Sequence, residues 1–364
     1  MSDYAAPLEE LAFSLFEVNG FGEHYSDYGL TEDDVWAVLR EAAKFAEREL
    51  APLNAIGDKE GVKFNKGEVL APTGFKEAYQ KYVAGGWPAL AQPLEYGGQA
   101  LPPSLSLCIA EIFQAANQSF CMYAKLGEGA CETLLNFGSN AVKRDYLPHL
   151  VSGRWTSTMC LTEAHAGSDL SLLRTKAEPC GDGLYQIYGS KVFISSGEHD
   201  LAENIVHLVL ARLPGAPSGT RGISLFLVPK RLVKADGSLG DANNISCGSI
   251  EHKMGLRGSA TCVMNFDGAE GYLVGPANRG LACMFVFMNA SRLGTAIQGQ
   301  AQADAALQMS LVYANERIQG STNTGRDPAG SRSKAIISHP DVQRMLLTQQ
   351  VFSEGGRAFL FTTP

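Results

Sequence analysis

The most informative stretch of this 364-residue chain is Met159-Cys160-Leu161-Thr162-Glu163-Ala164-His165-Ala166-Gly167-Ser168-Asp169. It begins as a β-prone segment and runs into a loop of small residues, which let the backbone approach a ligand closely. Thr162 and Ser168 add hydroxyl groups, and exposed loop N–H groups are natural donors to ring oxygens or phosphates. The residues alone leave two interpretations open: a ligand-binding loop, or a strand end with an ordinary capped turn.

A second stretch with the same character is Lys191-Val192-Phe193-Ile194-Ser195-Ser196-Gly197. Strand alternation predicts that Phe193 and Ser195 share one face. On that face they could flank a flat ring, the phenyl against its plane and the hydroxyl bonded to its edge. The alternative is that Phe193 is an ordinary core aromatic.

Both stretches belong to a predicted β region. Short β-forming segments separated by Gly, Pro, Asp and Asn are typical of a small sandwich or barrel. The turn at 180–183 marks a hairpin with the strand that follows it. The predicted strands are 157–161, 184–195, 205–213, 222–228 and 260–266.

Helical patterns lie on both sides of this region. Thr31 followed by Glu32, Asp33 and Asp34 predicts a helix N-terminus, and we expect Pro52 to end that helix. Residues 290–317 lack proline and carry an apolar stripe, which predicts a long helix. The other predicted helices are 73–84, 104–120, 128–137, 141–150 and 339–361.

These patterns predict an α+β multidomain fold in four parts. Residues 1–30 form an N-terminal arm, and 31–155 an N-terminal α-helical domain. Residues 156–275 form a middle β domain, and 276–364 an incomplete C-terminal helical bundle.

Composition narrows the class of function. There are 30 basic and 38 acidic side chains, a formal net charge of −8, so nothing favours nucleic acid or anionic membranes. No apolar run reaches the ~18 residues that a membrane span needs, and the N-terminus lacks signal-peptide features. The eight cysteines form no Cys-x-x-Cys pair, which argues against a metal site and against a disulfide framework. We therefore expect a cytoplasmic protein that handles small molecules.

The two stretches resemble the acyl-CoA dehydrogenase family, whose hallmark is Cys-x-Thr-Glu-Pro-x-Ala-Gly-Ser-Asp. Ala164 stands where that family usually has proline, and His165 where it usually has glycine. Two further runs are similar to family segments, Glu251-His252-Lys253-Met254-Gly255-Leu256-Arg257-Gly258-Ser259 and Pro93-Leu94-Glu95-Tyr96-Gly97-Gly98-Gln99. The matches fall in order along nearly the whole chain.

Within the family, the N-terminal arm and the run Met264-Asn265-Phe266-Asp267-Gly268-Ala269 resemble 3-methylmercaptopropionyl-CoA dehydrogenases. The resemblance implies an FAD-dependent enzyme that introduces an α,β double bond into an acyl-CoA thioester. The substrate would be 3-methylmercaptopropionyl-CoA, from dimethylsulfoniopropionate breakdown, or a short- or medium-chain acyl-CoA.

The resemblance also assigns roles to single residues. Ser168 matches a serine near the FAD pyrophosphate or the substrate thioester, and Asn289 and Arg292 match residues that line the CoA and acyl site. Arg317 matches an arginine that reaches the FAD pyrophosphate of a neighbouring subunit, on the same helix face as Arg292. The remaining cofactor positions, beside the flavin ring, are Met159, Leu161, Thr162, Phe193 and Ser195.

The catalytic base is the one role that finds no residue. The family glutamate usually lies in a Tyr-Glu-Gly-Thr segment well after Arg317, and no such segment occurs in these residues. A minority of the family places it just before the position of Arg292, where this chain has Ser291. For Glu354, the sequence favours a solvent-exposed position on a helix over a role as the catalytic base. We therefore expect a C-terminally shortened member of the family that binds FAD poorly and catalyses the reaction poorly.

Partners follow from the resemblance as well. It implies an acyl-CoA substrate, electron transfer to an electron-transferring flavoprotein, and a homodimer or homotetramer. Three alternatives stand beside the dehydrogenase. They are an oxidase or nitroalkane-oxidising relative, a DNA-associated relative that the charge of −8 disfavours, and a shortened, non-catalytic assembly or binding partner.

Overall fold

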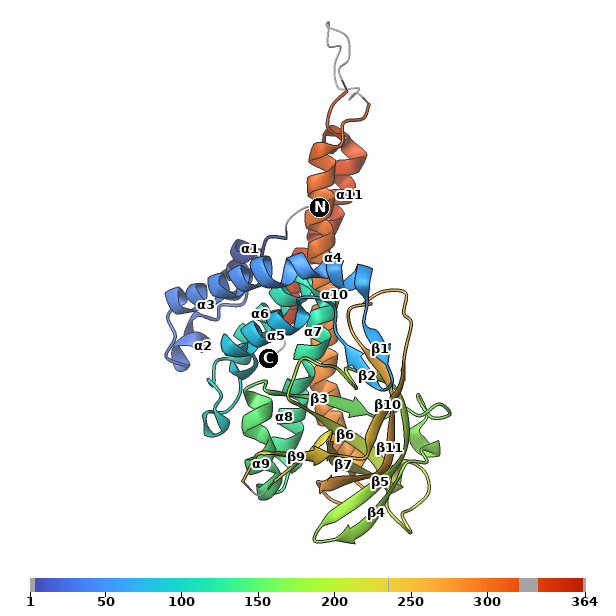
Figure 1. The fold of residues 1–364 in the computed structure, drawn as a ribbon. Helices are drawn as coiled ribbons and strands as arrows, with labels where there is room; N and C mark the ends of the chain where they lie inside the picture. Colours follow the sequence, from blue (N-terminus) through green and yellow to red (C-terminus); the bar gives the residue numbers. More distant parts are fainter. Residues whose placement is uncertain (1–3, 235, 321–332, 363–364) are drawn as a thin grey trace, which may run out of the picture. The chain divides into compact units, whose positions relative to one another are not determined.

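A computed structural model describes residues 4–234, 236–320 and 333–362 (Figure 1). The chain forms two compact units, each assembled from separate parts of the sequence. Unit 1 comprises Met1–Ala51, Pro102–Asn117 and Thr295–Pro364, and unit 2 comprises Pro52–Leu101 and Gln118–Gly294. The four predicted domains follow the chain in order, and their boundaries stay predictions.

Unit 1 is helical. Thr31 begins α3 as predicted, because its hydroxyl accepts from the Asp34 N–H at 3.2 Å and the Asp34 carboxylate accepts from the Thr31 N–H at 2.9 Å. The predicted arm folds into short helices rather than an extended strap. The elements of unit 1 are α1 (Leu8–Ala12), η1 (Phe13–Val18), α2 (Gly22–Asp27), α3 (Glu32–Phe45), η2 (Ala46–Leu50), α6 (Pro103–Ala116), η7 (Ile336–Ser338) and α11 (Pro340–Phe361), with the second part of α10 (Gly280–Glu316).

The prediction that Pro52 ends a helix is wrong. The helical path continues through η2 into α4 (Ala51–Glu60), with Pro52 in its first turn. Proline lacks an N–H, and its ring clashes with the carbonyl four residues earlier. The π-helical turn of η2 lies just before the proline, where a wider i→i+5 turn relieves that clash.

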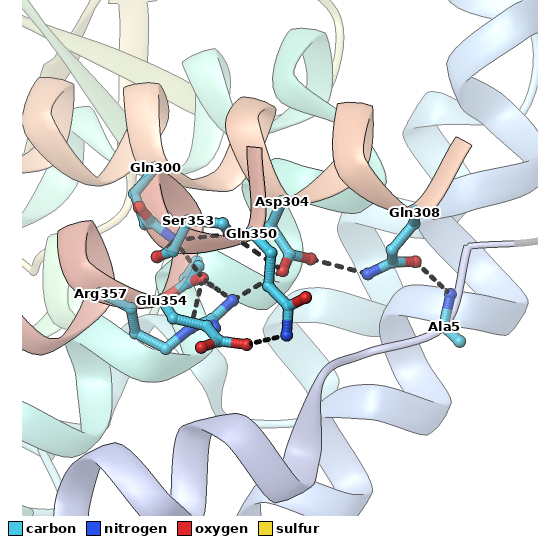
Figure 2. A network of polar contacts seen from close by, with 9 residues as sticks. Ala5, Gln300, Asp304, Gln308, Gln350, Ser353, Glu354 and Arg357 are labelled. Carbon is cyan, nitrogen blue, oxygen red and sulfur yellow. Dashed lines mark hydrogen bonds and ion pairs between the residues drawn. The ribbon is translucent and has the colours of Figure 1, made fainter. Parts of the chain in front are cut away.

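A buried ionic cluster joins three helices of unit 1 (Figure 2). Arg357 of α11 lies 2.7 Å from Oε1 of Glu111 on α6 and 2.7 Å from Oδ1 of Asp304 on α10. Gln300 adds a bond of 2.7 Å to the Ser353 carbonyl. Burial raises the pKa of Glu111, and Arg357 opposes that effect. Because Arg357 bonds both carboxylates, its loss would leave two buried acids without their shared cation.

Unit 2 combines helices with the β region. The predicted helix 104–120 is interrupted at Asn117, whose backbone is extended, so that α6 and α7 are separate. The helices of unit 2 are α4, α5 (Phe75–Ala84), η3 (Trp87–Ala89), η4 (Leu94–Tyr96), α7 (Gln118–Ala124), α8 (Leu126–Phe137), α9 (Asn140–Val151), η5 (Leu170–Leu172), η6 (Thr220–Gly222) and the first part of α10.

The sequence left a sandwich or a barrel open, and the paired strands of unit 2 form a closed circuit. The pairing runs β11–β5–β4–β6–β7 and returns to β11, while β10 and β3 extend its edges. The hairpin predicted at 180–183 joins β4 to β5. The strands are β1 (Lys63–Asn65), β2 (Glu68–Leu70), β3 (Trp155–Cys160), β4 (Lys176–Gly181), β5 (Leu184–Ser195), β6 (Asn204–Arg212), β7 (Ile223–Pro229), β8 (Arg231–Val233), β9 (Leu239–Ala242), β10 (Ile245–Ile250) and β11 (Thr261–Val274).

The core of unit 2 packs helices α8 and α9 and the start of α10 against the sheet. Trp155 at the start of β3 packs edge-to-face on Tyr146 of α9, with ring centroids 5.8 Å apart. Phe287 of α10 is buried in the same cluster, against Gly129 of α8. This packing gives β3, and the loop that follows it, a fixed base.

Helix α10 is longer than predicted, because it begins at Gly280. By length and composition it could cross a membrane, although the sequence analysis predicted no span. Only 28% of the apolar 18-residue segment of this helix is buried in the structure. Core helices of soluble proteins can have the same length and apolar composition, so these two properties are weak evidence for a membrane span.

Candidate functional site

The loop after β3 is a tight turn with exposed small residues. Glu163 and Ala166 exchange backbone hydrogen bonds of 2.9 and 3.0 Å, which fold the loop back on itself. Ala164, Gly167 and Ser168 are exposed, whereas Met159, Leu161 and Thr162 are half-buried. Among the described residues, neither the Thr162 nor the Ser168 N–H donates to another group. The loop therefore presents the free N–H groups of Thr162 and Ser168 beside the buried residues Glu163 and Ala166.

This loop lies against strand β5. The Val192 N–H donates to the Thr162 carbonyl at 2.9 Å, and the Lys191 ammonium donates to the Leu161 carbonyl at 3.0 Å. The two stretches singled out from the sequence are thus neighbours in space. The structure brings Leu161 and Thr162 next to the segment that carries Phe193.

Phe193 is not a core aromatic. Its side chain is 62% exposed, and its φ of +60° lies in the left-handed region that residues other than glycine rarely adopt. The register of β5 against β11 shifts here, with two residues of β5 opposite Val263. Such a β-bulge re-aims a side chain, and strained exposed residues cluster at functional sites. The bulge interrupts alternation between Lys191 and Ile194, whereas beyond it the buried Ile194 separates the exposed Phe193 from the half-buried Ser195. The prediction that Phe193 and Ser195 share one face stays a prediction.

Ser195 follows the bulge at the end of β5. It pairs with Thr261 of β11 and is half-buried. The next residue, Ser196, again has a positive φ, and its N–H donates to the Ala260 carbonyl at 2.8 Å. The end of β5 is therefore held by main-chain bonds on both sides of the exposed Phe193.

A buried ion pair lies beneath this surface, and the sequence analysis did not identify it. The Lys191 ammonium, 0% exposed, lies 2.9 Å from Oε1 of Glu163, which is 4% exposed. Burial alone would raise the pKa of Glu163, but Lys191 and hydrogen bonds from Thr175 and Arg174 outweigh it and lower that pKa to about 2. The available signal was Lys191, the one charged residue of the predicted strand 184–195, together with the acidic Glu163 in the other quoted stretch.

Two of the predicted substrate residues lie together on α10. Arg292 donates to Oδ1 of Asn289 at 3.1 Å, and its guanidinium lies 5.2 Å from the centre of the Phe285 ring. Both Asn289 and Arg292 are exposed. They form a polar and cationic face suited to anionic groups of a ligand.

Two other candidate residues lie in unit 1. Arg317 is exposed, follows the last residue of α10, and donates to Oε1 of Gln319 at 3.1 Å. The Arg317 N–H donates to the Tyr313 carbonyl at 2.8 Å, so the helical hydrogen-bond pattern reaches this residue, and its placement on the face of Arg292 stays a prediction. Glu354 is exposed on α11 and accepts from Gln350 at 2.6 Å.

Cysteine and metal chemistry contribute nothing visible to this site. All eight cysteines are free, and only Cys180 is exposed. Within the described residues, no cluster of three or more His, Cys, Asp or Glu side chains is arranged to hold a metal ion.

Comparisons with known proteins give the chain a family. Residues 32–154 match the N-terminal domain, and residues 158–269 the middle domain, of the acyl-CoA dehydrogenases. The chain is 45% identical over 367 residues to 3-methylmercaptopropionyl-CoA dehydrogenase of Ruegeria pomeroyi, covering 99% of this chain and 61% of that protein. It is 39% identical over 352 residues to a butyryl-CoA dehydrogenase of Syntrophomonas wolfei, covering 93% and 57%.

A solved structure shares the fold. Butyryl-CoA dehydrogenase from Megasphaera elsdenii matches with a TM-score of 0.73 at 22% identity, covering 90% of this chain and 78% of that one. The chain spans about three fifths of the length of the two curated relatives it matches. The resemblance read from its motifs is confirmed: the chain belongs to the acyl-CoA dehydrogenase family.

Proposed function

We propose that the protein is an FAD-dependent acyl-CoA dehydrogenase that introduces a double bond between the α and β carbons of an acyl-CoA thioester. The substrate is 3-methylmercaptopropionyl-CoA or a short- or medium-chain acyl-CoA. The observation that carries the proposal is the strained, exposed Phe193 held against the loop at Leu161 and Thr162. Family membership and the 45% identity to a 3-methylmercaptopropionyl-CoA dehydrogenase support it.

The residues around Phe193 fit a flavin. An exposed ring, the hydroxyl of Ser195 and the unpaired N–H of Thr162 offer an aromatic surface with hydrogen-bonding groups beside it. Met159 and Leu161 add half-buried apolar contacts. Bound FAD would accept the hydride that leaves the β carbon. Cofactor contacts are proposed for Met159, Leu161, Thr162, Phe193, Ser195 and Arg317.

The substrate contacts are proposed on the loop and on α10. Ser168 is exposed at the loop tip and can donate to a phosphate or a thioester oxygen. Arg292, oriented by Asn289, can bind an anionic part of CoA. The proton on the α carbon requires a carboxylate base, and we propose no residue of this chain for that role. Ser291 stands where a minority of the family has the glutamate.

Further proposals concern the assembly. We propose that the protein is cytoplasmic, forms a homodimer or homotetramer, and passes its electrons to an electron-transferring flavoprotein. These proposals follow from its family.

The test is reductive titration of the FAD-loaded protein. The intact mass of the natural polypeptide is first compared with 39.0 kDa. The FAD-loaded protein is then mixed anaerobically with 3-methylmercaptopropionyl-CoA or with butyryl-CoA while the flavin spectrum is recorded. Loss of the oxidised flavin spectrum with either thioester supports the proposal. A flavin that binds but stays oxidised with both contradicts it and favours a non-catalytic binding partner.

The same titration on residues 1–364 alone asks where the base lies. We expect no bleaching, because the family's carboxylate positions are not filled. If bleaching occurs, a base exists among these residues, and Glu354→Gln is the first variant to make.

A further inference from the structure

The Glu163–Lys191 pair is unusual for its position. Both side chains are almost completely buried, and removing two ions from water is costly unless each gains strong partners. A pair that only filled space could be replaced by apolar side chains of similar size. The groups to which Glu163 and Lys191 are hydrogen-bonded therefore indicate what the pair does.

Lys191 connects the two halves of the proposed flavin surface. It stands on β5, two residues before Phe193, yet its ammonium bonds the Leu161 carbonyl at 3.0 Å and the Glu163 carboxylate at 2.9 Å. The adjacent Val192 N–H bonds the Thr162 carbonyl at 2.9 Å. Three consecutive loop residues, 161 to 163, are thus tied to the strand just before the bulge.

Glu163 is held from the opposite side. Its Oε1 accepts from the Thr175 hydroxyl at 2.6 Å and from the Thr175 N–H at 3.0 Å, while Oε2 accepts from the Arg174 N–H at 2.8 Å. His165 lies 3.4 Å from Oε2. Thr175 approaches Gly189 so closely that a Cβ at position 189 would clash with the Thr175 hydroxyl. The carboxylate is therefore a fixed reference point for the loop.

We propose that Lys191 and Glu163 are positioning residues for the flavin, which fix the separation between the loop at residues 161–163 and the Phe193 bulge. This inference rests on the proposed function, because it assigns the surface between them to FAD. The pair itself stays beneath that surface. Its effect is to keep the Thr162 N–H and the Phe193 ring at the spacing that a flat ring requires.

A second, less buried ion pair in unit 2 supplies a comparison, with side chains 36% and 11% exposed. Lys230 pairs with Glu198, whose carboxylate also accepts from the His199 N–H at 2.9 Å. Within the part of the chain that the structure describes, the side-chain hydrogen bonds of this pair involve no residue of the loop 161–169 and none of the bulge. Removing Lys230 should cost stability without disturbing the proposed flavin surface.

The experiment compares FAD binding with stability in three variants of the full protein. They are Lys191→Met, Lys230→Met and the double variant Lys191→Met/Glu163→Leu, which removes both buried charges. FAD affinity is measured by titration of the apoprotein, the flavin environment by visible circular dichroism of the bound cofactor, and stability by thermal unfolding of the apoprotein.

We expect Lys191→Met to weaken FAD binding at least about tenfold, since small displacements of positioning groups have large effects. Lys230→Met should lower the melting temperature and leave FAD affinity and the dichroism spectrum unchanged. The double variant should recover part of the stability lost in Lys191→Met, because no buried charge is left unpaired, although Thr175 and Arg174 lose their acceptor. It should still bind FAD at least about tenfold more weakly, with an altered spectrum, because the loop has lost its link. It also provides the test if Lys191→Met does not fold.

Two results would overturn the inference. One is a double variant that recovers both stability and wild-type FAD affinity, which makes the pair purely structural. The other is an equal loss of FAD affinity in Lys191→Met and Lys230→Met, in proportion to lost stability. If the wild-type protein itself binds no FAD, the proposed function fails, and this inference fails with it.

Discussion

At the scale of single residues, Phe193 carries more information than any other side chain of the candidate site. An aromatic with a φ of +60° and 62% exposure gains little from the fold and strains its own backbone. The same residue is a good surface for a flat ligand. Local strain with no visible structural benefit is what a ligand-binding role would explain.

Replacing Phe193 by glycine separates strain from binding. Phe193→Gly relieves about 1 kcal/mol of backbone strain, partly offset by the greater freedom of glycine in the unfolded chain. We expect a melting temperature of the apoprotein that is unchanged or slightly higher. FAD affinity, measured by titration, should fall about tenfold, or about 1.4 kcal/mol, because the ring contact is lost.

The control is Phe64→Gly on strand β1, where the ring is also exposed, at 38%. It should leave FAD affinity unchanged. An equal effect of the two substitutions would remove Phe193 from the proposed site.

Glu163 gives a prediction about acid stability. Its folded pKa, about 2, lies below its ordinary value of 4.5, so its ionisation stabilises the native state above pH 4.5. That contribution is lost as the pH falls from about 4.5 towards about 2. The uncharged Glu163→Gln should therefore show a smaller decrease in unfolding free energy over this range, measured by urea denaturation at several pH values.

Glu178→Gln is the matched control, because Glu178 pairs with Lys176 at the surface. Surface pairs contribute little, so the wild-type pH dependence should persist. A Glu163→Gln variant with undiminished pH dependence would show that the Glu163 carboxylate is not stabilised in the folded state.

At the scale of elements, close approach decides which glycines matter. Gly129 lies in helix α8 opposite the buried ring of Phe287, and an added Cβ would lie 2.2 Å from that ring. Helix propensity alone would favour alanine at this position. Packing opposes it, since the ring lies within a close-packed core and has little room to move.

We expect Gly129→Ala to lower the unfolding free energy by about 1–3 kcal/mol through overpacking. Gly355→Ala in helix α11 is the comparison, because no atom lies within 4 Å of an added Cβ there. It should raise the unfolding free energy by roughly 0.5–1 kcal/mol. Denaturant unfolding of the two variants measures both signs, and two changes of the same sign would contradict the packing argument.

At the scale of the molecule, one arginine, Arg357, links three helices of unit 1. Arg357 forms ion pairs with Glu111 and Asp304, carried by two other helices. Figure 2 shows Arg357 beside Asp304. Arg357→Met leaves these carboxylates buried without their cation, which typically costs about 3–5 kcal/mol. Hydrogen exchange should show the loss as faster exchange of the amides of α11.

Arg344→Met provides the control on the same helix. Arg344 pairs with Asp341 at the surface, with both side chains mostly exposed, so its loss should change stability by less than about 0.5 kcal/mol. If both substitutions cost the same, the buried cluster is not what holds α11.

Arg317 tests the proposed assembly. If it reaches the FAD of a neighbouring subunit, Arg317→Ala weakens FAD binding in the oligomer, because a cation close to a pyrophosphate is lost. Gln343→Ala, an exposed position on α11, should not change FAD affinity. Equal FAD affinities of the two variants would exclude the proposed role of Arg317.

The sequence by itself determined the succession of a helical, a β and a helical region, the cap at Thr31, the hairpin at 180–183 and the family. It did not predict the short strands β1, β2, β8, β9 and β10. Caps, turns and hydrophobic periods are local, and motif residues keep their identity whatever surrounds them. Tertiary structure decided three other features: the passage of the helix through Pro52, the bulge that exposes Phe193, and the pairing of Lys191 with Glu163. Each depends on strand register or on burial between residues distant in the chain, which no local pattern records.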